Sequence, residues 1–77
     1  MHNESFVRVV GIQSFHTDEQ IREMTIKQHA QNNGHYATQI CRQCGCIKWD
    51  LDGDVKTAIV INGGKDCSCC EPARRLI

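Results

Sequence analysis

The first apolar run of the chain is short and rich in valine. Residues 5–10, SFVRVV, combine β-branched and aromatic residues with a single charge, a composition typical of a β-strand. Gly11 follows directly, at a position where a glycine ends or bulges a strand. The pattern therefore predicts a strand over residues 5–10.

A longer segment, residues 16–35, has apolar residues at the spacing of an amphipathic helix. The sequence Thr-Asp-Glu-Gln at 17–20 has the form of a capping box at the helix start, and Asn-Asn-Gly at 32–34 predicts the helix end. The apolar stripe is narrow, and Ile21 and Met24 lie on it. Because such a stripe covers little core, we expect these two residues to bind a groove on a partner protein.

Apolar residues flank an Asp-Gly pair in the segment CIKWDLDGDVKTAIVI, residues 46–61. An Asp-Gly pair between two apolar runs is a strong signal for a β-hairpin turn. With a loop over residues 52–54, Trp49 lies opposite Thr57 and a continuous apolar set falls on one face. The pattern predicts a hairpin whose two strands lie on either side of the Asp-Gly pair.

Length and composition limit how these elements are held together. The chain has 77 residues, of which only 5% are aromatic, whereas six are cysteines. A core of this size supplies roughly 3–5 kcal/mol of net stability, so small natural domains often add a metal or disulfides. We predict a single α+β domain over residues 1–77, with a strand–helix segment at 1–40 and a cysteine-linked hairpin segment at 41–77.

The six cysteines fall in two clusters on either side of the predicted hairpin. The clusters CRQCGC and CSCC together contain the spacing C-x2-C-x22-C-x2-C. Two such pairs bring four thiolates to one ion, with Zn–S distances near ~2.3 Å, and Gly45 suits the tight turn that this needs. The spacing predicts one structural zinc ion with four ligands: Cys41, Cys44, Cys67 and Cys70.

Two further cysteines, Cys46 and Cys69, are predicted to be small buried residues. They also leave alternatives open, since Cys46 competes with Cys44, and Cys69 is a substitute for Cys67 or Cys70. Three disulfides are another alternative. The chain starts without a secretory signal and has no run of the ~18–20 apolar residues that cross a bilayer, so we expect a reducing, cytoplasmic location. In such a compartment clustered cysteines more often bind metal.

Residues 41–70 resemble the zinc-ribbon class in the CRQCG turn, the following predicted hairpin and the close-set cysteines of CSCC. Unlike that class, the second pair lacks a following glycine. The resemblance implies a structural metal and a role in recognition, since zinc ribbons serve as protein- or nucleic-acid-binding modules in transcription, replication and translation machinery. The stretch CRQCGCIKWDLDGD is also similar to the first iron-binding loop of rubredoxins, which implies iron and electron transfer as an alternative.

Four thiolates around one metal leave no open coordination position, so we expect no enzymatic activity. Nine basic residues balance nine acidic ones, and the chain therefore has no overall field that attracts nucleic acid. A protein partner is favoured, because a small neutral chain is typical of a regulator or inhibitor of a larger machine, phage-encoded ones included. The alternative is direct nucleic-acid binding through a basic patch of Arg42, Lys48, Arg74 and Arg75.

Overall fold

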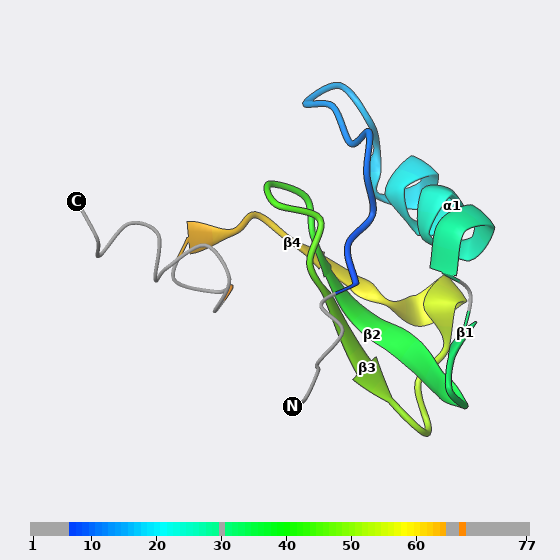
Figure 1. The fold of residues 1–77 in the computed structure, drawn as a ribbon. Helices are drawn as coiled ribbons and strands as arrows, with labels where there is room; N and C mark the ends of the chain where they lie inside the picture. Colours follow the sequence, from blue (N-terminus) through cyan, green and yellow to red (C-terminus); the bar gives the residue numbers. More distant parts are fainter. Residues whose placement is uncertain (1–6, 30, 65–66, 68–77) are drawn as a thin grey trace.

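The computed structural model describes residues 7–29, 31–64 and 67 (Figure 1). Within this part the chain forms one α-helix, one short 3-10 helix and four β-strands, so the predicted α+β class is confirmed. In chain order the elements are α1 (Asp18–His29), β1 (Gln31–Asn32), β2 (His35–Cys41), β3 (Ile47–Asp50), η1 (Val55–Thr57) and β4 (Ile59–Ile61). None of the helical segments in the described part has the length and apolar character that crossing a membrane requires.

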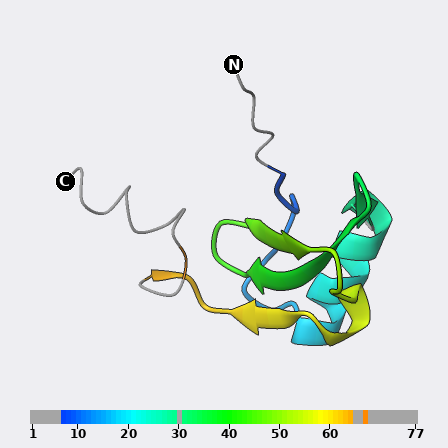
Figure 2. The same cartoon turned by 90° about the horizontal axis from the view of Figure 1, so that it is seen from below.

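The central strand of the sheet is β2, which Figure 2 shows between β3 and β4. β3 runs antiparallel to it, whereas β4 runs parallel to it beside residues 39–41. The short β1 pairs with the start of β2, on the same edge as β4, because β3 occupies the other edge. The strand β2 runs across residue 40, where we placed the boundary between the strand–helix segment and the cysteine-linked segment. Both segments therefore contribute to one sheet.

The predicted hairpin around the Asp-Gly pair is wrong. Trp49 lies opposite Ala37 of β2 instead of Thr57, and the chain passes through η1 before β4 returns on the far edge of β2. The side chain of Asp54 caps η1, so the Asp-Gly region serves a longer connection. β2 takes both neighbours because it is the buried strand, with no exposed surface at Ala37 or Ile40.

Residues 7–10 do not form the predicted strand, whose first two residues lie outside the described part. Among these four residues only Arg8 makes a β-bridge, and it does so with Cys46. The Val10 backbone N–H donates to the Gln28 side-chain oxygen, and the Gln28 amide donates to the Val10 carbonyl, both at 2.9 Å. Because a side-chain amide satisfies these backbone groups, the segment is held by α1 instead of by a second strand.

The start of α1 is the predicted capping box. The Gln20 backbone N–H donates to Thr17 Oγ1 at 3.1 Å, and the Thr17 backbone N–H donates to Gln20 Oε1 at 2.8 Å. The helix ends at His29, earlier than predicted. Asn33 and Gly34, with φ of 54° and 86°, form the tight turn between β1 and β2. The predicted stop signal therefore serves a β-hairpin, which favours two residues of positive φ.

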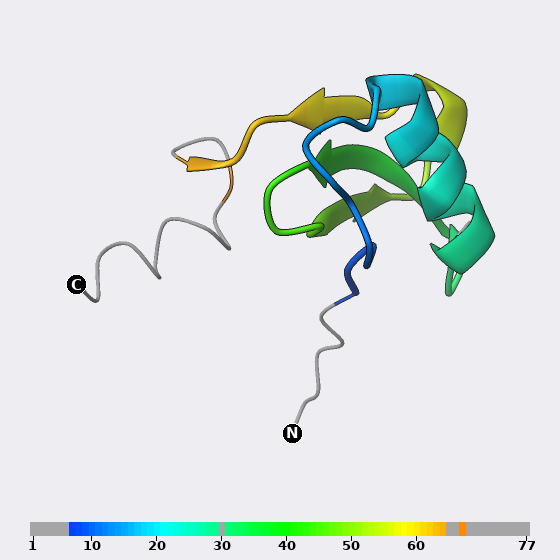
Figure 3. The same cartoon turned by 90° about the horizontal axis from the view of Figure 1, so that it is seen from above.

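The helix α1 lies against the sheet, as Figures 2 and 3 show from opposite sides, and its apolar residues join the core there. The main core cluster consists of Val9, Ile21, Ile40 and Ala58, with Met24 packed beside it in a partly buried position. Ile21 has no exposed surface, and the buried Thr25 hydroxyl donates to the Ile21 carbonyl at 2.9 Å. Ile21 thus has no exposed surface to offer a partner in this structure, because the helix uses its narrow apolar stripe for the core of its own domain.

Candidate metal centre

The first cysteine pair, Cys41 at the end of β2 and Cys44 in the loop before β3, lies in a closed turn. The Gly45 backbone N–H donates to the Cys41 carbonyl at 2.8 Å, and the Cys41 N–H donates to the Cys46 carbonyl at 2.9 Å. The Cys44 backbone N–H points to the Cys41 sulfur at 3.5 Å. These bonds fold the backbone over the Cys41 sulfur, which is the geometry expected for a metal-binding C-x2-C turn.

Gly45 is the residue that this turn requires. Its φ of 81° lies in the left-handed region, which glycine adopts without steric cost. A Cβ atom at this position would clash with the Val9 carbonyl oxygen, because the two backbones are in direct contact. The Val9 N–H donates to the Gly45 carbonyl at 2.8 Å. The segment around Val9 is thus clamped onto the cysteine loop.

The strand β4 leads toward Cys67, which lies close to this loop. Ile61 lies beside Cys41 in the parallel pair, and its carbonyl accepts a hydrogen bond from the Arg42 N–H at 2.9 Å. The Cys67 backbone N–H then donates to the Gly64 carbonyl at 3.2 Å, which closes the following turn. Parallel strands end at the same edge of a sheet, so the ends of β2 and β4 deliver their cysteines to one place.

Three cysteine sulfurs converge at this edge. The Sγ atoms of Cys41, Cys44 and Cys67, called the sulfur trio below, all lie within 4.8 Å of one another. The distance between the Cys44 and Cys67 sulfurs is 3.5 Å. Tetrahedral zinc with Zn–S bonds of ~2.3 Å separates its sulfur ligands by about 3.8 Å. The spacing therefore fits a single metal ion, while the fourth expected ligand, Cys70, lies outside the described residues.

Burial of the sulfur trio is uneven and affects its ionisation. Cys41 is 1% exposed and Cys67 is 5% exposed, whereas Cys44 is only half-buried. Burial raises the pKa of the Cys41 thiol above its ordinary value, although the backbone N–H groups of Cys44 and Gln43 act in the opposite direction. A cation held by the sulfurs favours the thiolate form and offsets the cost of burying its charge. The site is therefore chemically suited to a metal.

Cys46 belongs to the same buried cluster but not to the sulfur trio. It packs with Cys41 and Cys67, and it is disulfide-bonded. The prediction that Cys46 is buried is confirmed, but the prediction that it is an ordinary buried thiol is wrong. It does not take the place of Cys44 in the trio. Cys69 lies outside the described residues.

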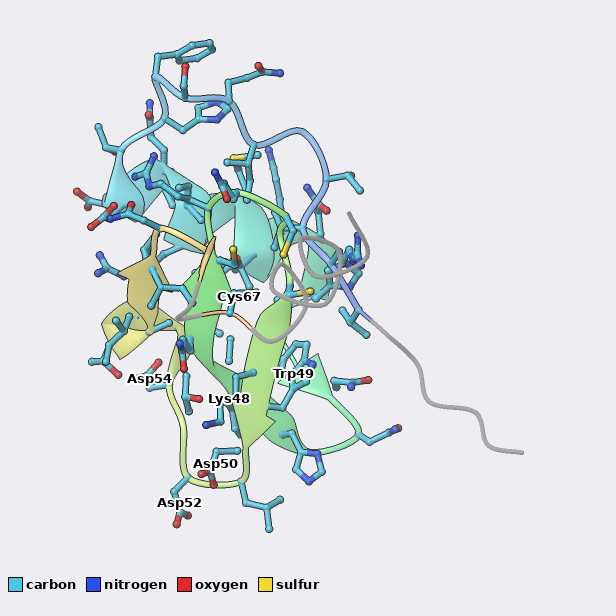
Figure 4. The ribbon with its side chains drawn as sticks, turned by 90° about the vertical axis from the view of Figure 1, so that its left-hand side faces the viewer. Lys48, Trp49, Asp50, Asp52, Asp54 and Cys67 are labelled. Carbon is cyan, nitrogen blue, oxygen red and sulfur yellow. The ribbon has the colours of Figure 1, made fainter. Side chains whose placement is uncertain are left out.

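Within residues 7–29, 31–64 and 67, no carboxylate joins this group of sulfurs. Figure 4 shows Cys67 well separated from Asp50 and Asp52, which project at the far end of β3. Among the residues that the structure describes, the group suited to a metal consists of sulfur donors alone. Sulfur ligands select zinc and iron, whereas magnesium and calcium prefer oxygen. The donor set therefore points to a soft or borderline metal.

Arg42, which we expected in a basic patch, instead links the cysteine loop to α1. Its guanidinium forms an ion pair with Asp18 at 2.7 Å and donates to the His16 carbonyl at 3.2 Å. Lys48 is exposed on β3. The two other residues of the expected patch, Arg74 and Arg75, lie outside the described part. Arg42 is thus committed to holding the helix start beside the metal-binding loop.

The structure brings together three of the four cysteines on which the zinc-ribbon resemblance rests, but it does not form the hairpin expected between them. Cys41 ends β2, Cys44 lies in the loop before β3, and Cys67 comes after the parallel strand β4. No family model, curated protein or solved structure matches the chain. What the described residues offer chemically is a buried sulfur cluster at the junction of two segments distant in sequence.

Proposed function

We propose that this chain is a non-enzymatic recognition module built around one structural zinc ion. Cys41, Cys44, Cys67 and Cys70 would hold the ion, and the convergence of three of these sulfurs within 4.8 Å of one another is the observation that carries the proposal. Four thiolates complete a tetrahedron and leave no position for water or substrate, so the metal supports the fold instead of performing chemistry.

The position of the sulfur trio supports a structural role. Cys41 ends β2, Cys44 lies in the next loop, and Cys67 follows β4, so an ion held there cross-links elements far apart in the chain. The main apolar core of the described residues is small, with four fully buried members. A metal cross-link is the kind of addition that such a small core needs.

Iron is the alternative metal, because the same sulfur donors suit both ions. A rubredoxin-like protein would then carry electrons instead of recognising a partner. The two readings are separated by the absorption spectrum of the purified protein, since an iron–thiolate protein is red and a zinc protein is colourless.

The proposed partner is a protein, and the module would act as a regulator or inhibitor of a larger machine that works on nucleic acids. Two features support this choice over direct nucleic-acid binding. The chain has no net charge, and Arg42 is already paired with Asp18. Ile21 is buried, so Met24 remains of the two residues expected to contact a partner, and it is partly buried. Large apolar side chains exposed in the described part of the chain include Val10, Phe15, Ile26, Leu51 and Ile59.

The proposal is tested by removing the metal from reduced, full-length protein with a chelator and following its NMR spectrum. We expect the signals of residues 41–46 and 59–61 to shift or broaden, because the ion would join these two segments. Signals of α1, whose contacts are with the apolar core, should change less. An unchanged spectrum would refute the structural metal, and salt-dependent binding to oligonucleotides would favour the nucleic-acid alternative.

A further inference from the structure

We propose that Cys44 is the oxidation site of the sulfur trio, and that a peroxide converts Cys44 and Cys67 into a disulfide. The disulfide would remove two sulfur donors from the metal site, so loss of metal is the consequence. That consequence rests on the proposed function. The formation of the disulfide does not, because it depends only on the placement of the two thiols.

Cys44 is the accessible member of the trio. Cys41 and Cys67 are 1% and 5% exposed, whereas Cys44 is half-buried. A solution oxidant meets the most exposed sulfur first, since reaction requires direct contact with the thiolate. The difference in burial therefore singles out one of three otherwise equivalent cysteines.

A cavity leads to this residue. It has a volume of about 290 Å³ and is lined by residues 8–12 on one side and by residues 43–45 on the other. The cavity is large enough for a small peroxide. Cys44 itself is among the residues that line this cavity, so a molecule in the cavity can meet this residue.

Cys67 is placed to complete the reaction. Its sulfur lies 3.5 Å from the Cys44 sulfur, and a disulfide bond is about 2.05 Å long. An approach of roughly 1.5 Å between the two sulfurs is therefore sufficient for bond formation.

The reaction balances in two steps. The Cys44 thiolate attacks one oxygen of the peroxide, an S–O bond forms, the O–O bond breaks, and hydroxide leaves. Cys44 is then a sulfenic acid. The Cys67 thiolate attacks the Cys44 sulfur, an S–S bond forms, and the S–O bond breaks with loss of a second hydroxide. With hydrogen peroxide, two thiols and one peroxide give one disulfide and two water molecules.

The first test measures accessibility and needs no variant. Full-length protein, reduced and free of metal, is treated with limiting iodoacetamide, and modified cysteines are located by mass spectrometry. We expect Cys44 to react at least about tenfold faster than Cys41 or Cys67, because the rate follows thiol exposure. Faster modification of Cys41 or Cys67 would overturn the assignment.

The second test identifies the disulfide. Trypsin cuts after Arg42 and Lys48, so a Cys46→Ser variant leaves Cys44 as the one cysteine of peptide 43–48. After treatment with hydrogen peroxide, this peptide should be cross-linked to the tryptic peptide 66–74, which contains Cys67. Fragmentation of the cross-linked pair should locate the bond at Cys67. Adding Cys67→Ser should lower the yield of cross-linked peptide 43–48 at least about fivefold, since the nearest thiol is then absent. In the protein that retains Cys67, a cross-link mainly from Cys44 to any other cysteine would refute the proposal.

Failure of the two proposals can be told apart by following zinc release from zinc-loaded protein in the same experiment. Protein that binds no zinc before oxidation refutes the proposed metal function, and the cross-link still tests the present inference in the metal-free thiols. Protein that binds zinc and releases it on oxidation without a Cys44–Cys67 cross-link refutes the inference alone.

Discussion

The backbone N–H of Val9 donates to the carbonyl of Gly45 at 2.8 Å, and the Val9 carbonyl occupies the space that a side chain at Gly45 would need. This contact holds the segment around Val9 against the turn that contains Cys41 and Cys44. It also makes Gly45 necessary for two independent reasons, its φ of 81° and the close approach of Val9.

Gly45→Ala should therefore lower the free energy of unfolding by more than about 2 kcal/mol, since a left-handed backbone costs ~1–2 kcal/mol and the clash adds to it. Gly34→Ala is the matched control, because Gly34 has φ of 86° but open space around the Cβ position. In this control the free energy of unfolding should fall only by the cost of the left-handed backbone, about 1–2 kcal/mol. Chemical denaturation of both variants measures the difference, and equal losses would show that the Val9 contact does not matter.

Substitution of the trio should remove the metal. Cys41→Ser and Cys44→Ser each take one sulfur from the cluster, so we expect metal content to fall to a small fraction of wild type. Cys46→Ser should retain the metal, because Cys46 lies outside the trio and is disulfide-bonded. Elemental analysis of the three purified variants provides the comparison. Retention by Cys44→Ser together with loss by Cys46→Ser would mean that the wrong ligand had been identified.

Arg42→Ala should act on stability and not on nucleic-acid binding. The ion pair with Asp18 is partly exposed, with side chains 22% and 54% accessible, so we expect a loss of at most about 1 kcal/mol. Lys48→Ala, at an exposed position, should change stability by less than about 0.5 kcal/mol. Oligonucleotide titrations at low and moderate salt check the second part. A steep salt dependence that disappears in Arg42→Ala would establish the basic patch instead.

Acidity should have opposite effects on the metal-free and metal-bound forms. In the folded metal-free protein, burial raises the pKa of the Cys41 thiol above that of the unfolded chain. The stabilising effect of the neutral thiol is fully present below the unfolded pKa and is lost as pH rises through the folded pKa. Metal-bound protein should instead lose stability as pH falls, because protons compete for the thiolates.

Thermal unfolding of metal-free protein between about pH 7 and about pH 10 tests the predicted loss of stability with rising pH, since this range spans the ordinary thiol pKa. Cys41→Ala serves as the control, because it lacks the titrating group. A metal-free wild type that gains stability over this range relative to Cys41→Ala would contradict the burial argument.

Local signals predicted the local features correctly. The capping box at Thr17 and Gln20 forms as expected, because both bonds join residues close in sequence. The gathering of Cys41 and Cys44 follows from the C-x2-C spacing and Gly45, which act within a single turn. These features depend on steric and hydrogen-bonding preferences that a short stretch of sequence contains.

The sheet could not be predicted in the same way. The middle of β2 contains Thr38 and Gln39, so the central strand lacks a clear apolar pattern. Gly53 was interpreted as a hairpin-turn residue, but the structure requires it because its backbone lies against Thr38. The parallel pairing of β4 with β2 joins residues about twenty positions apart in the sequence. The sequence of neither strand alone indicates this pairing.

One ion pair was missed for a related reason. Asp18 has Arg22 four residues later, which is a favourable pairing on an isolated helix. In the folded chain the Arg22 side chain donates to the Ala58 carbonyl at 2.8 Å, and Asp18 pairs with Arg42. Tertiary contacts therefore replace a weak local pair.

The metal content of the full-length protein, purified under reducing conditions, tests the central claim most directly. Elemental analysis should find about one zinc ion per chain, and zinc added to metal-free protein should restore that ratio, as four converging thiolates bind one tetrahedral ion. Protein that contains no metal and takes up none from solution would contradict the account.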